Sequence, residues 1–285
     1  MNSRPKMPPL LQRTLIWLAI LFAWEAAYRT IGWKPWKFPA PSHVLDSLTA
    51  MLNRPTAFAD ELRPGWPWVQ QERGQPRPVY RSPLIAANLV SAARLSIGFV
   101  LSIALGGVIG LAMWRFASLD GFLGPVLLGL QTLPSVCWVP LAVLVFGINE
   151  VGVMFVLIMG SFSAIAIALR DGLRTIPPLY RRAGLMLGAS GWKLYRYVLL
   201  PASLPAFAAS LRQGFSFAWR SLLGAELIMA VELHGLGFLL AMGRDFADVA
   251  QVVAVMIVMV LIGMLADRWV FARLQQAVNA RFGLS

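Results

Sequence analysis

The chain has 285 residues, of which 58% are hydrophobic and 13% charged, and its mean hydropathy is +0.66. Soluble domains contain roughly 45–50% apolar and about 25% charged residues, so this composition excludes a disordered chain and argues against a soluble globular protein. A single cysteine excludes a disulfide framework and a cysteine-ligated zinc site, and two histidines leave little material for a metal cluster. The net charge of +12 suits nucleic acid, anionic lipid or an anionic substrate, and the location of the charges decides between them.

Several apolar segments are long enough to cross a bilayer, which requires about 20 mostly apolar residues. In chain order they are 10–31, 95–114, 121–148, 151–169, 204–231 and 249–266. The sequence therefore predicts an all-α membrane protein with about six transmembrane helices. The alternative is the buried helical core of a soluble protein, but four of the segments have almost no charged face. No small-x-small cleavage site follows the first segment, so we interpret it as an uncleaved anchor rather than as a signal peptide.

The polar segment 32–84 is rich in proline and tryptophan, and tryptophan favours the membrane–water interface. Ser42 is suited to cap a short helix. The apolar residues of this helix form one stripe at helical spacing, which predicts that it lies at the interface; they are Val44, Leu45, Leu48, Met51 and Leu52. The stretch 64–81 is predicted to be irregular.

The third predicted crossing, 121–148, contains Pro125, Pro134 and Pro140. Each proline removes a helix hydrogen bond, so this crossing is predicted to be kinked or locally unwound. Transporters often place such breaks along a pathway, and a tolerated kink packed between helices explains any one proline equally well. Cys137 is interpreted as a small packing residue.

Ionisable residues inside the apolar segments are candidates for function. Arg94 and Arg212 lie close to predicted helix ends, so we expect their side chains to extend toward the interface. Glu25 is expected to be structural, bonded to a neighbouring helix. Arg220 and Glu226 are six residues apart on one helix and point to different faces, so a direct pair between them is not expected. Arg220 either lines a pathway and attracts an anion or bonds to carbonyl groups of a neighbouring helix.

The charges between the apolar segments predict the orientation. With the N-terminus inside, the inner segments hold 13 basic and 3 acidic residues and the outer segments hold 8 of each. These inner segments are 1–14, 114–121, 170–200 and 267–285. We therefore expect both termini in the cytoplasm. No basic stripe is interleaved with aromatic residues in a soluble module, so nucleic acid is not an expected partner.

The polar interruption 170–200 is long enough to fold by itself. Pro177 and Pro178 fit the start of a helix, and Gly188 and Gly191 end it. A second apolar face follows at helical spacing, formed by Trp192, Leu194, Tyr195, Val198 and Leu199. The pattern predicts two short helices joined by a glycine turn, which either dock a partner or anchor at the interface.

This segment resembles the permease subunits of bacterial ABC importers. Their pattern is Glu-Ala-Ala, three residues, Gly, nine residues and Ile-x-Leu-Pro, and this chain has Ala183-Gly184, then Gly188, then Val198-Leu199-Leu200-Pro201 at the same spacing. Arg182 stands where the family has Glu, which puts any ion pair of that Glu in doubt. The resemblance implies contacts with an ATPase at Arg182, Ala183, Gly184, Gly188, Ala189, Ser190, Trp192, Val198, Leu200 and Pro201.

The resemblance covers about 85–275 and is closest to the nitrate, sulfonate, taurine and bicarbonate subfamily. Three motifs before the segment 170–200 and three motifs after it carry this resemblance. The first of the six is Gln131-Thr132-Leu133-Pro134 and the last is Gly235-Leu236-Gly237. Candidate residues for a translocation pathway are Gln131, Thr132, Pro134, Trp138, Trp219, Arg220 and Glu226. On this reading 1–84 is an anchor helix with a periplasmic loop, 85–275 is the permease core with its coupling segment at 170–201, and 276–285 is a cytoplasmic tail.

The resemblance implies one subunit of an ATP-driven importer in the bacterial inner membrane, moving a small anion by alternating access. The chain has no Gly-Lys dipeptide and hence no phosphate loop, so we expect no catalytic residue or cofactor in it. ATP and magnesium are expected on a separate ATPase pair, and a binding protein and a second permease copy, forming a homodimer, are the other expected partners. The alternatives are a stand-alone secondary transporter or channel, and a membrane enzyme, which the scarcity of histidine disfavours.

Overall fold

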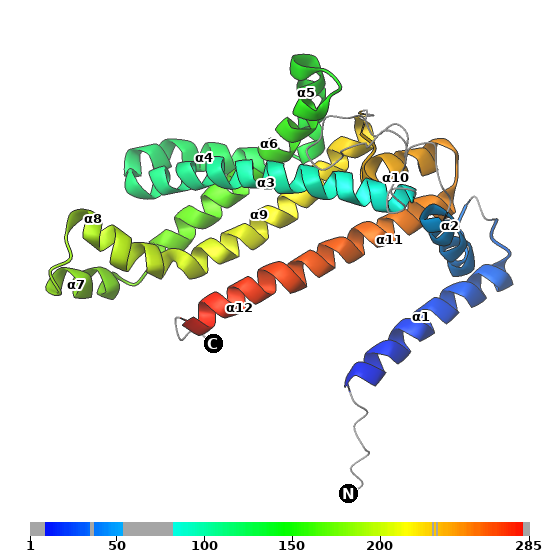
Figure 1. Cartoon of the computed structure of the whole chain (residues 1–285), viewed down its shortest axis with the longest axis horizontal. Helices are drawn as coiled ribbons and strands as arrows, with labels where there is room; N and C mark the ends of the chain where they lie inside the picture. Colours follow the sequence, from blue (N-terminus) through cyan, green and yellow to red (C-terminus); the bar gives the residue numbers. More distant parts are fainter. Residues whose placement is uncertain (1–8, 35–36, 54–81, 230, 232, 282–285) are drawn as a thin grey trace, which may run out of the picture. The chain divides into compact units, whose positions relative to one another are not determined.

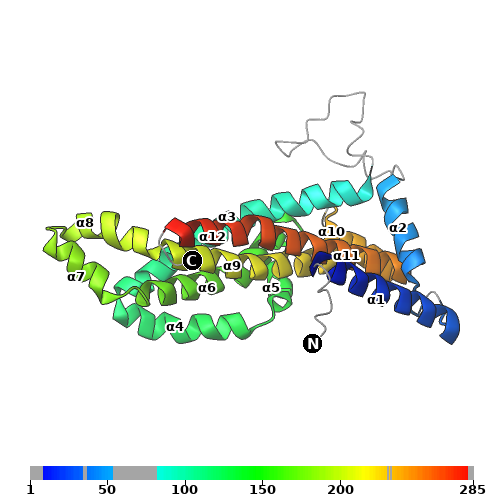
Figure 2. The same cartoon turned by 90° about the horizontal axis from the view of Figure 1, so that it is seen from below.

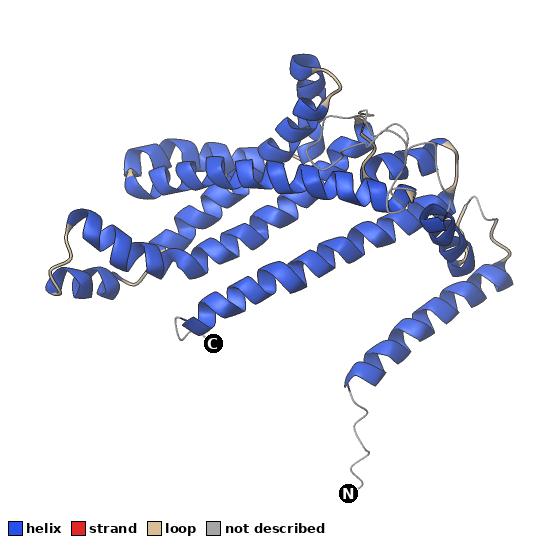
Figure 3. Ribbon diagram, viewed as in Figure 1, coloured by secondary structure: helices blue, strands red, loops and turns tan. Residues whose placement is uncertain are grey.

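The computed structural model describes residues 9–34, 37–53, 82–229, 231 and 233–281. The described regular structure is entirely helical (Figure 3). In chain order the elements are α1 (Pro9–Ile31), α2 (Pro41–Asn53), α3 (Pro83–Arg115), α4 (Ala117–Thr132), η3 (Ser135–Cys137), α5 (Trp138–Phe146), α6 (Glu150–Arg174), α7 (Pro178–Met186), α8 (Gly191–Leu194), η4 (Tyr195–Leu199), α9 (Leu200–Ile228), α10 (Leu236–Asp245), α11 (Val249–Ala266), η5 (Asp267–Phe271) and α12 (Ala272–Arg281) (Figure 1). The chain divides into two compact units, one of residues 1–86 and 239–258 and one of residues 87–238 and 259–285.

In the first unit, polar contacts join α1 to α2. The carboxylate of Glu25 accepts hydrogen bonds from Arg29 of its own helix (2.9 Å) and from the hydroxyl of Ser42 (3.3 Å). The expectation that Glu25 is bonded to a neighbouring helix is thus confirmed. The expected cap is wrong, because α2 already begins at Pro41 and the Ser42 hydroxyl is engaged by Glu25. The predicted irregular stretch 64–81 lies outside the described residues.

The first unit also brings α2 next to the second half of the chain. Residues of α2, α10 and α11, with Pro83, line one cavity of about 460 Å³. The side-chain amide of Gln251 donates to the carbonyl of Leu239 (2.8 Å) and ties α11 to α10. Described parts of two segments that the charge distribution predicts to be on the same side of the membrane, namely α2 and residues 239–248, therefore meet in this unit.

The second unit is built on α3, α6 and α9. Gly106 and Gly110 lie one turn apart on α3, and a Cβ atom at Gly110 would stand 2.6 Å from the carbonyl oxygen of Ala166 on α6. Small residues at this spacing allow two helix backbones to approach closely, as in many membrane proteins. Gly172 of α6 likewise lies directly against Ala206 of α9, so these two helices also approach closely. In both views α6 and α9 run side by side (Figures 1 and 2).

The predicted third crossing is broken, as its prolines led us to expect. Between α4 and the η3–α5 pair the helix axis turns by 96°. The break falls at Pro134, whereas Pro125 lies inside α4 and Pro140 in the first turn of α5. A Cβ atom at Gly160, near the middle of α6, would lie 3.0 Å from Cβ of Ser135, so the break packs beside the middle of α6.

Three helical runs are long and apolar enough to span a bilayer among the described residues: Pro83–Arg115, Glu150–Arg174 and Val249–Arg281. If α4 and the η3–α5 pair are taken together as one bent span, they form a fourth. The other two predicted crossings correspond to α1 and α9. Both are long helices with charged residues along them, and for these two the spanning assignment stays a prediction.

Candidate functional site

The segment predicted to dock a partner comprises α7, the turn after it, α8 and η4, and we call residues 178–199 the docking segment. Pro178 occupies the first turn of α7, where its missing N–H costs nothing. The helix ends in a Schellman motif, in which Gly188 (φ +79°) donates to the carbonyl of Leu185 (3.0 Å) and Ala189 donates to that of Gly184 (2.9 Å). The predicted glycine turn is therefore confirmed.

The second predicted helix differs from the expectation. The helical run from Gly191 continues through η4 into α9 without interruption, so this helix is the start of α9 and not a separate element. Residues 195–199 form a π turn directly before Pro201. A proline inside a helix lacks the N–H of an i→i−4 bond and crowds the preceding turn, and a π turn accommodates that disruption.

A close contact holds the two arms of the docking segment together. Gly184 is buried, and a Cβ atom there would lie 2.7 Å from Cδ1 of Leu194 and 3.0 Å from Cγ2 of Val198. Tyr195 packs edge-on against Trp114 of α3, with ring centroids 5.9 Å apart. Of the predicted apolar face, Trp192 does not join this packing and remains exposed.

The outer face of the docking segment is apolar and basic. Of the ten residues assigned to partner contact, Gly184 is buried, Ala189, Val198 and Pro201 are half-buried, and the rest are exposed, namely Arg182, Ala183, Gly188, Ser190, Trp192 and Leu200. The most exposed apolar side chains lie at the turn, where Met186 is 89% and Leu187 is 87% exposed. Such an apolar cluster on a chain surface is typical of a contact site.

The predicted pathway residues fall into separate places. Gln131, Thr132 and Pro134 lie at the end of α4 and at the break, and Trp138 begins α5 with its ring edge-on to Phe155, 6.2 Å between centroids. Trp219 is buried on α9 near Gly263 of α11. The structure therefore brings the first four together along one bent span, and α9, which carries the other three, contacts this span at η3.

Arg220 and Glu226 have different environments, and no ion pair joins them. The exposed Arg220 donates through Nε to the carbonyl of Ser216 (3.0 Å), and its guanidinium lies 4.7 Å from the ring centre of Phe217. Among the described residues Arg220 has no carboxylate partner. Glu226 is buried among donors from other parts of the unit.

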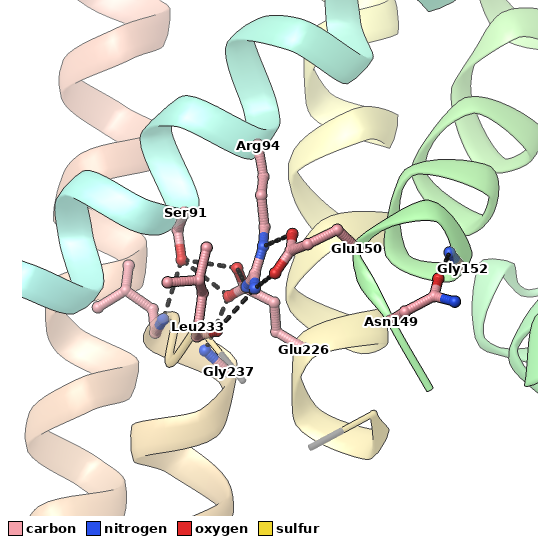
Figure 4. A network of polar contacts seen from close by, with 9 residues as sticks. Ser91, Arg94, Asn149, Glu150, Gly152, Glu226, Leu233 and Gly237 are labelled. Carbon is pink, nitrogen blue, oxygen red and sulfur yellow. Dashed lines mark hydrogen bonds and ion pairs between the residues drawn. The ribbon is translucent and has the colours of Figure 1, made fainter. Parts of the chain in front are cut away.

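Figure 4 shows this buried cluster, which comprises Ser91, Arg94, Glu150 and Glu226. Arg94 of α3 is 1% exposed, and its guanidinium donates through Nη1 to Glu226 of α9 (2.8 Å) and through Nε to Glu150 at the start of α6 (2.8 Å). Its Nη2 donates to Glu150 and to the carbonyl of Leu233 (2.6 Å). One side chain thus joins three helices and the segment that follows α9.

The carboxylate of Glu226 also fixes the start of α10. It accepts hydrogen bonds from the hydroxyl of Ser91 (2.8 Å) and from the backbone N–H of Gly237 (3.1 Å). The Ser91 oxygen in turn accepts from the backbone N–H of Leu236 (2.9 Å). The first N–H groups of a helix have no partner within it, so α10 takes its cap from α3 and α9.

The expectation for Arg94 is therefore wrong. Its side chain does not extend to the interface, because Glu150 and Glu226 offset the cost of burying its charge. The signal that was available is the sign of the charges: Arg94 and Glu150 border apolar segments and Glu226 lies within one, so charges of opposite sign occur at or in apolar segments far apart in the sequence. Arg212, by contrast, is 44% exposed and pairs through Nε and Nη2 with Asp267 of η5 (2.6 and 2.7 Å).

A second charged cluster lies at the other end of α6 and comprises Asp120, Arg170 and Arg174. Asp120, in the first turn of α4, accepts from Arg170 (2.9 Å) and from Arg174 (2.6 Å). Arg174 is 47% exposed, Asp120 15% and Arg170 11%, and Arg170 also pairs with Asp171. The described residues contain no group of three or more His, Cys, Asp or Glu side chains that could hold a metal ion.

Residues 83–279 match the family described as "Binding-protein-dependent transport system inner membrane component". The chain belongs to this family. The match includes both charged clusters and the docking segment, and it begins with α3. An inner membrane component of this kind is a transport subunit, in agreement with the interpretation of the sequence.

Individual relatives match over about two thirds of this inner membrane component. An ABC transporter permease protein of Methanocaldococcus jannaschii is 31% identical over 185 residues, or 65% of this chain and 69% of that protein. The taurine transport system permease protein of Escherichia coli is 29% identical over 177 residues, or 62% of this chain and 64% of that protein. The bicarbonate transport system permease protein of Synechococcus elongatus is 28% identical over 183 residues, or 64% and 66% of the two chains.

A solved structure has a similar fold. The inward-facing MetNI methionine ABC transporter contains a chain that superimposes with a TM-score of 0.58. The superposition covers 68% of this chain and 95% of that chain at 18% sequence identity. At this identity the likeness concerns the fold alone.

Proposed function

We propose that this chain is the permease subunit of an ATP-driven importer, and that the docking segment binds a separate ATPase. The observation that carries the proposal is the exposed apolar turn at Met186 and Leu187 in a chain of this transport family. The turn is held rigidly by the Schellman motif and by the contact of Gly184 with the start of α9. A force on α7 is therefore transmitted into the long helical run that includes α9.

The pathway in this proposal runs past the break between α4 and α5, and opens by alternating access. Interrupted helices leave backbone groups free to meet a substrate near the middle of the membrane. The break packs beside the middle of α6, and η3 also contacts α9, since a Cβ atom at Gly224 would lie 3.0 Å from Cγ2 of Val136. Rocking of α9 relative to α4 and α5 would change the width of this region.

We propose a small solute with an oxyanion group as the substrate. The named substrates of the relatives, taurine and bicarbonate, both carry one. Arg220 adds support, because its exposed guanidinium has no carboxylate partner in the described part of the chain, and such a group on a helix proposed to span the membrane is a suitable site for an anion. Affinities of the cognate binding protein for taurine, nitrate and bicarbonate would decide between members of this class.

The other partners follow from the same function. A binding protein would deliver the substrate, ATP and magnesium would be held by the ATPase, and two identical copies of this chain would enclose the pathway. The apolar outer face of α5, with Leu144 and Val145 exposed, offers a surface for the second copy. Cross-linking of a Leu144→Cys variant in membranes tests the pairing, and monomers alone would contradict it.

The proposed orientation has both termini in the cytoplasm of a multi-pass inner membrane protein. Asp46 of α2 and Lys193 of α8 are both exposed and are expected on opposite sides. In a Cys137→Ala background, Asp46→Cys should react with an impermeant thiol reagent added outside, and Lys193→Cys should not. The opposite pattern would overturn the orientation and, with it, the assignment of the docking segment.

Docking of the ATPase is tested by removing the apolar turn. The double variant Met186→Ser and Leu187→Ser changes two side chains that are almost fully exposed, so it leaves the fold unchanged. The ATPase should no longer co-purify with it. Phe246→Ser, at an exposed apolar residue after α10, is the matched control and should retain the ATPase. A stand-alone transporter would instead show uptake into liposomes without any ATPase or ATP.

A further inference from the structure

The docking segment carries charges of one sign only. From 172 to 225 the sequence contains no acidic residue. The segment has four cations, Arg181, Arg182, Lys193 and Arg196, and all four are exposed. None of them forms an ion pair within the part of the chain that the structure describes. The apolar turn is therefore flanked on both sides in the sequence by positive charge that the described residues do not compensate.

We propose that the ATPase partner of this chain presents an acidic groove, with at least one aspartate or glutamate facing Arg182. This inference rests on the proposed function and adds the chemistry of the partner surface. The pattern that the segment resembles has a glutamate at the position of Arg182, so the sign of the contact is reversed here. A partner with a basic group at that point would be repelled, whereas a carboxylate would form a bidentate pair with the guanidinium.

The geometry of α9 favours a protein over lipid headgroups as the occupant of this surface. At about 1.5 Å per residue, the part of α9 between Ala206 and Glu226 is about 30 Å long, which matches the hydrocarbon thickness of a bilayer. Ala206 lies level with Gly172 near the end of α6. The same helical run extends from Ala206 to Gly191 by roughly 22 Å more.

The headgroup layer on each side is only about 5–8 Å thick. The run bends where η4 meets α9 (Figure 1), but its length exceeds this thickness, so the proposal places Gly191 and the turn next to it at or beyond the outer edge of the headgroups. An exposed apolar turn in water, flanked by cations, is complementary to an apolar groove rimmed by carboxylates. Opposite charges steer association and like charges suppress wrong partners. The change from glutamate to arginine at position 182 would therefore also disfavour binding of ATPases whose surface is complementary to the glutamate.

A direct test uses a zero-length carbodiimide, which joins an amine only to a carboxylate in contact with it. In the complex of the full chain with its ATPase, Lys193 and an Arg182→Lys variant should each form an amide bond with an aspartate or glutamate of the ATPase, located by mass spectrometry. Arg281→Lys, exposed on α12 outside the docking segment, is the control and should not. If neither Lys193 nor the Arg182→Lys variant links to an ATPase carboxylate, the inference is overturned.

A second test measures binding of the ATPase to the chain in nanodiscs. Arg182→Glu should weaken the association at least about tenfold at ~0.1 M salt, and the loss should shrink at ~1 M salt because the screening length falls from about 10 to about 3 Å. The equally exposed Arg281→Glu should change it less than about twofold. Equal or tighter binding by Arg182→Glu would overturn the inference.

The same binding experiment distinguishes a failure of this inference from a failure of the proposed function. If Arg182→Glu binds normally while the Met186→Ser and Leu187→Ser variant does not, the docking site stands and only the acidic groove is excluded. If both variants bind normally, the docking assignment itself fails. An effect of Arg182→Glu that appears only with anionic lipid, and not with phosphatidylcholine, would assign the cations to the membrane and overturn the inference.

Discussion

The buried cluster gives the sharpest stability prediction. Glu226→Gln keeps the size of the side chain and removes its charge. Three donors now share the carboxylate: Nη1 of Arg94 (2.8 Å), the hydroxyl of Ser91 (2.8 Å) and the N–H of Gly237 (3.1 Å). The amide of glutamine offers one oxygen to these donors and adds two N–H groups of its own. At least one buried donor is therefore left without an acceptor.

The expected loss is large because neither partner can be hydrated. Arg94 and Glu226 are each 1% exposed at the side chain, and the remaining counter-charge, Glu150, is 29% exposed. Breaking a buried pair by changing one member costs about 3–5 kcal/mol. For a chain of this size 1 kcal/mol corresponds to roughly 2–4 °C, so the apparent Tm should fall by about 6–20 °C.

The assay is the loss of the monodisperse peak of the detergent-solubilised chain after heating for a fixed time. Asp267→Asn is the matched control, since it removes a carboxylate that pairs with Arg212 where both side chains are 40% or more exposed. An exposed pair contributes about 0–1 kcal/mol, so the control should lower the apparent Tm by at most about 4 °C. If Glu226→Gln behaves like Asp267→Asn, the reasoning from burial is refuted.

Two further predictions concern packing and transport. Gly110→Leu should lower the apparent Tm, because its Cβ would stand 2.6 Å from a carbonyl oxygen of α6 and overpacking costs about 1–3 kcal/mol. The control Gly107→Leu, at a site with open space, should leave the apparent Tm unchanged. Equal shifts in the two variants would contradict the close approach of α3 and α6. Arg220→Gln should abolish uptake in the assembled complex and Arg220→Lys should retain part of it, since the charge remains while the planar fork is lost. Uptake at the normal rate by Arg220→Gln would exclude a pathway role.

The features that the sequence predicted correctly depend on local chemistry. The third crossing breaks at one of its prolines, Pro134, because a proline in a helix interior removes a hydrogen bond, while Pro125 is tolerated inside α4 and Pro140 in the first turn of α5. Gly188 ends α7 because only a residue without Cβ adopts a φ of +79° without strain. The spacing from Gly188 to Pro201, together with the series of motifs from Gln131 to Gly237 on six predicted crossings, also identified the family, which the match over 83–279 confirms.

The errors arose where the structure depends on distant parts of the chain. Polarity predicted a separate second helix in 170–200, yet a helix that leaves the membrane can continue in water with polar side chains, and nothing local ends it before α9. The cap on α2 was misplaced because Ser42 is bonded to Glu25, on another helix. Arg94 was misjudged because its partner Glu226 is 132 positions away.

The two charged clusters at the ends of α6 differ in strength for the same physical reason. At the Glu150 end the arginine is withdrawn from water, so separating α3 from α6 would remove one of the two carboxylates that compensate a buried charge and leave it to Glu226 of α9 alone. At the other end, Asp120 pairs with Arg174, which is 47% exposed, so water and salt can replace that contact at about 0–1 kcal/mol, whereas the Asp120–Arg170 pair is only 15% and 11% exposed. Breaking the contacts of α4 with α6 is therefore less costly than breaking those of α3 with α6. Since α4 leads into the break at Pro134, the weaker cluster lies on the element whose movement would change the proposed pathway.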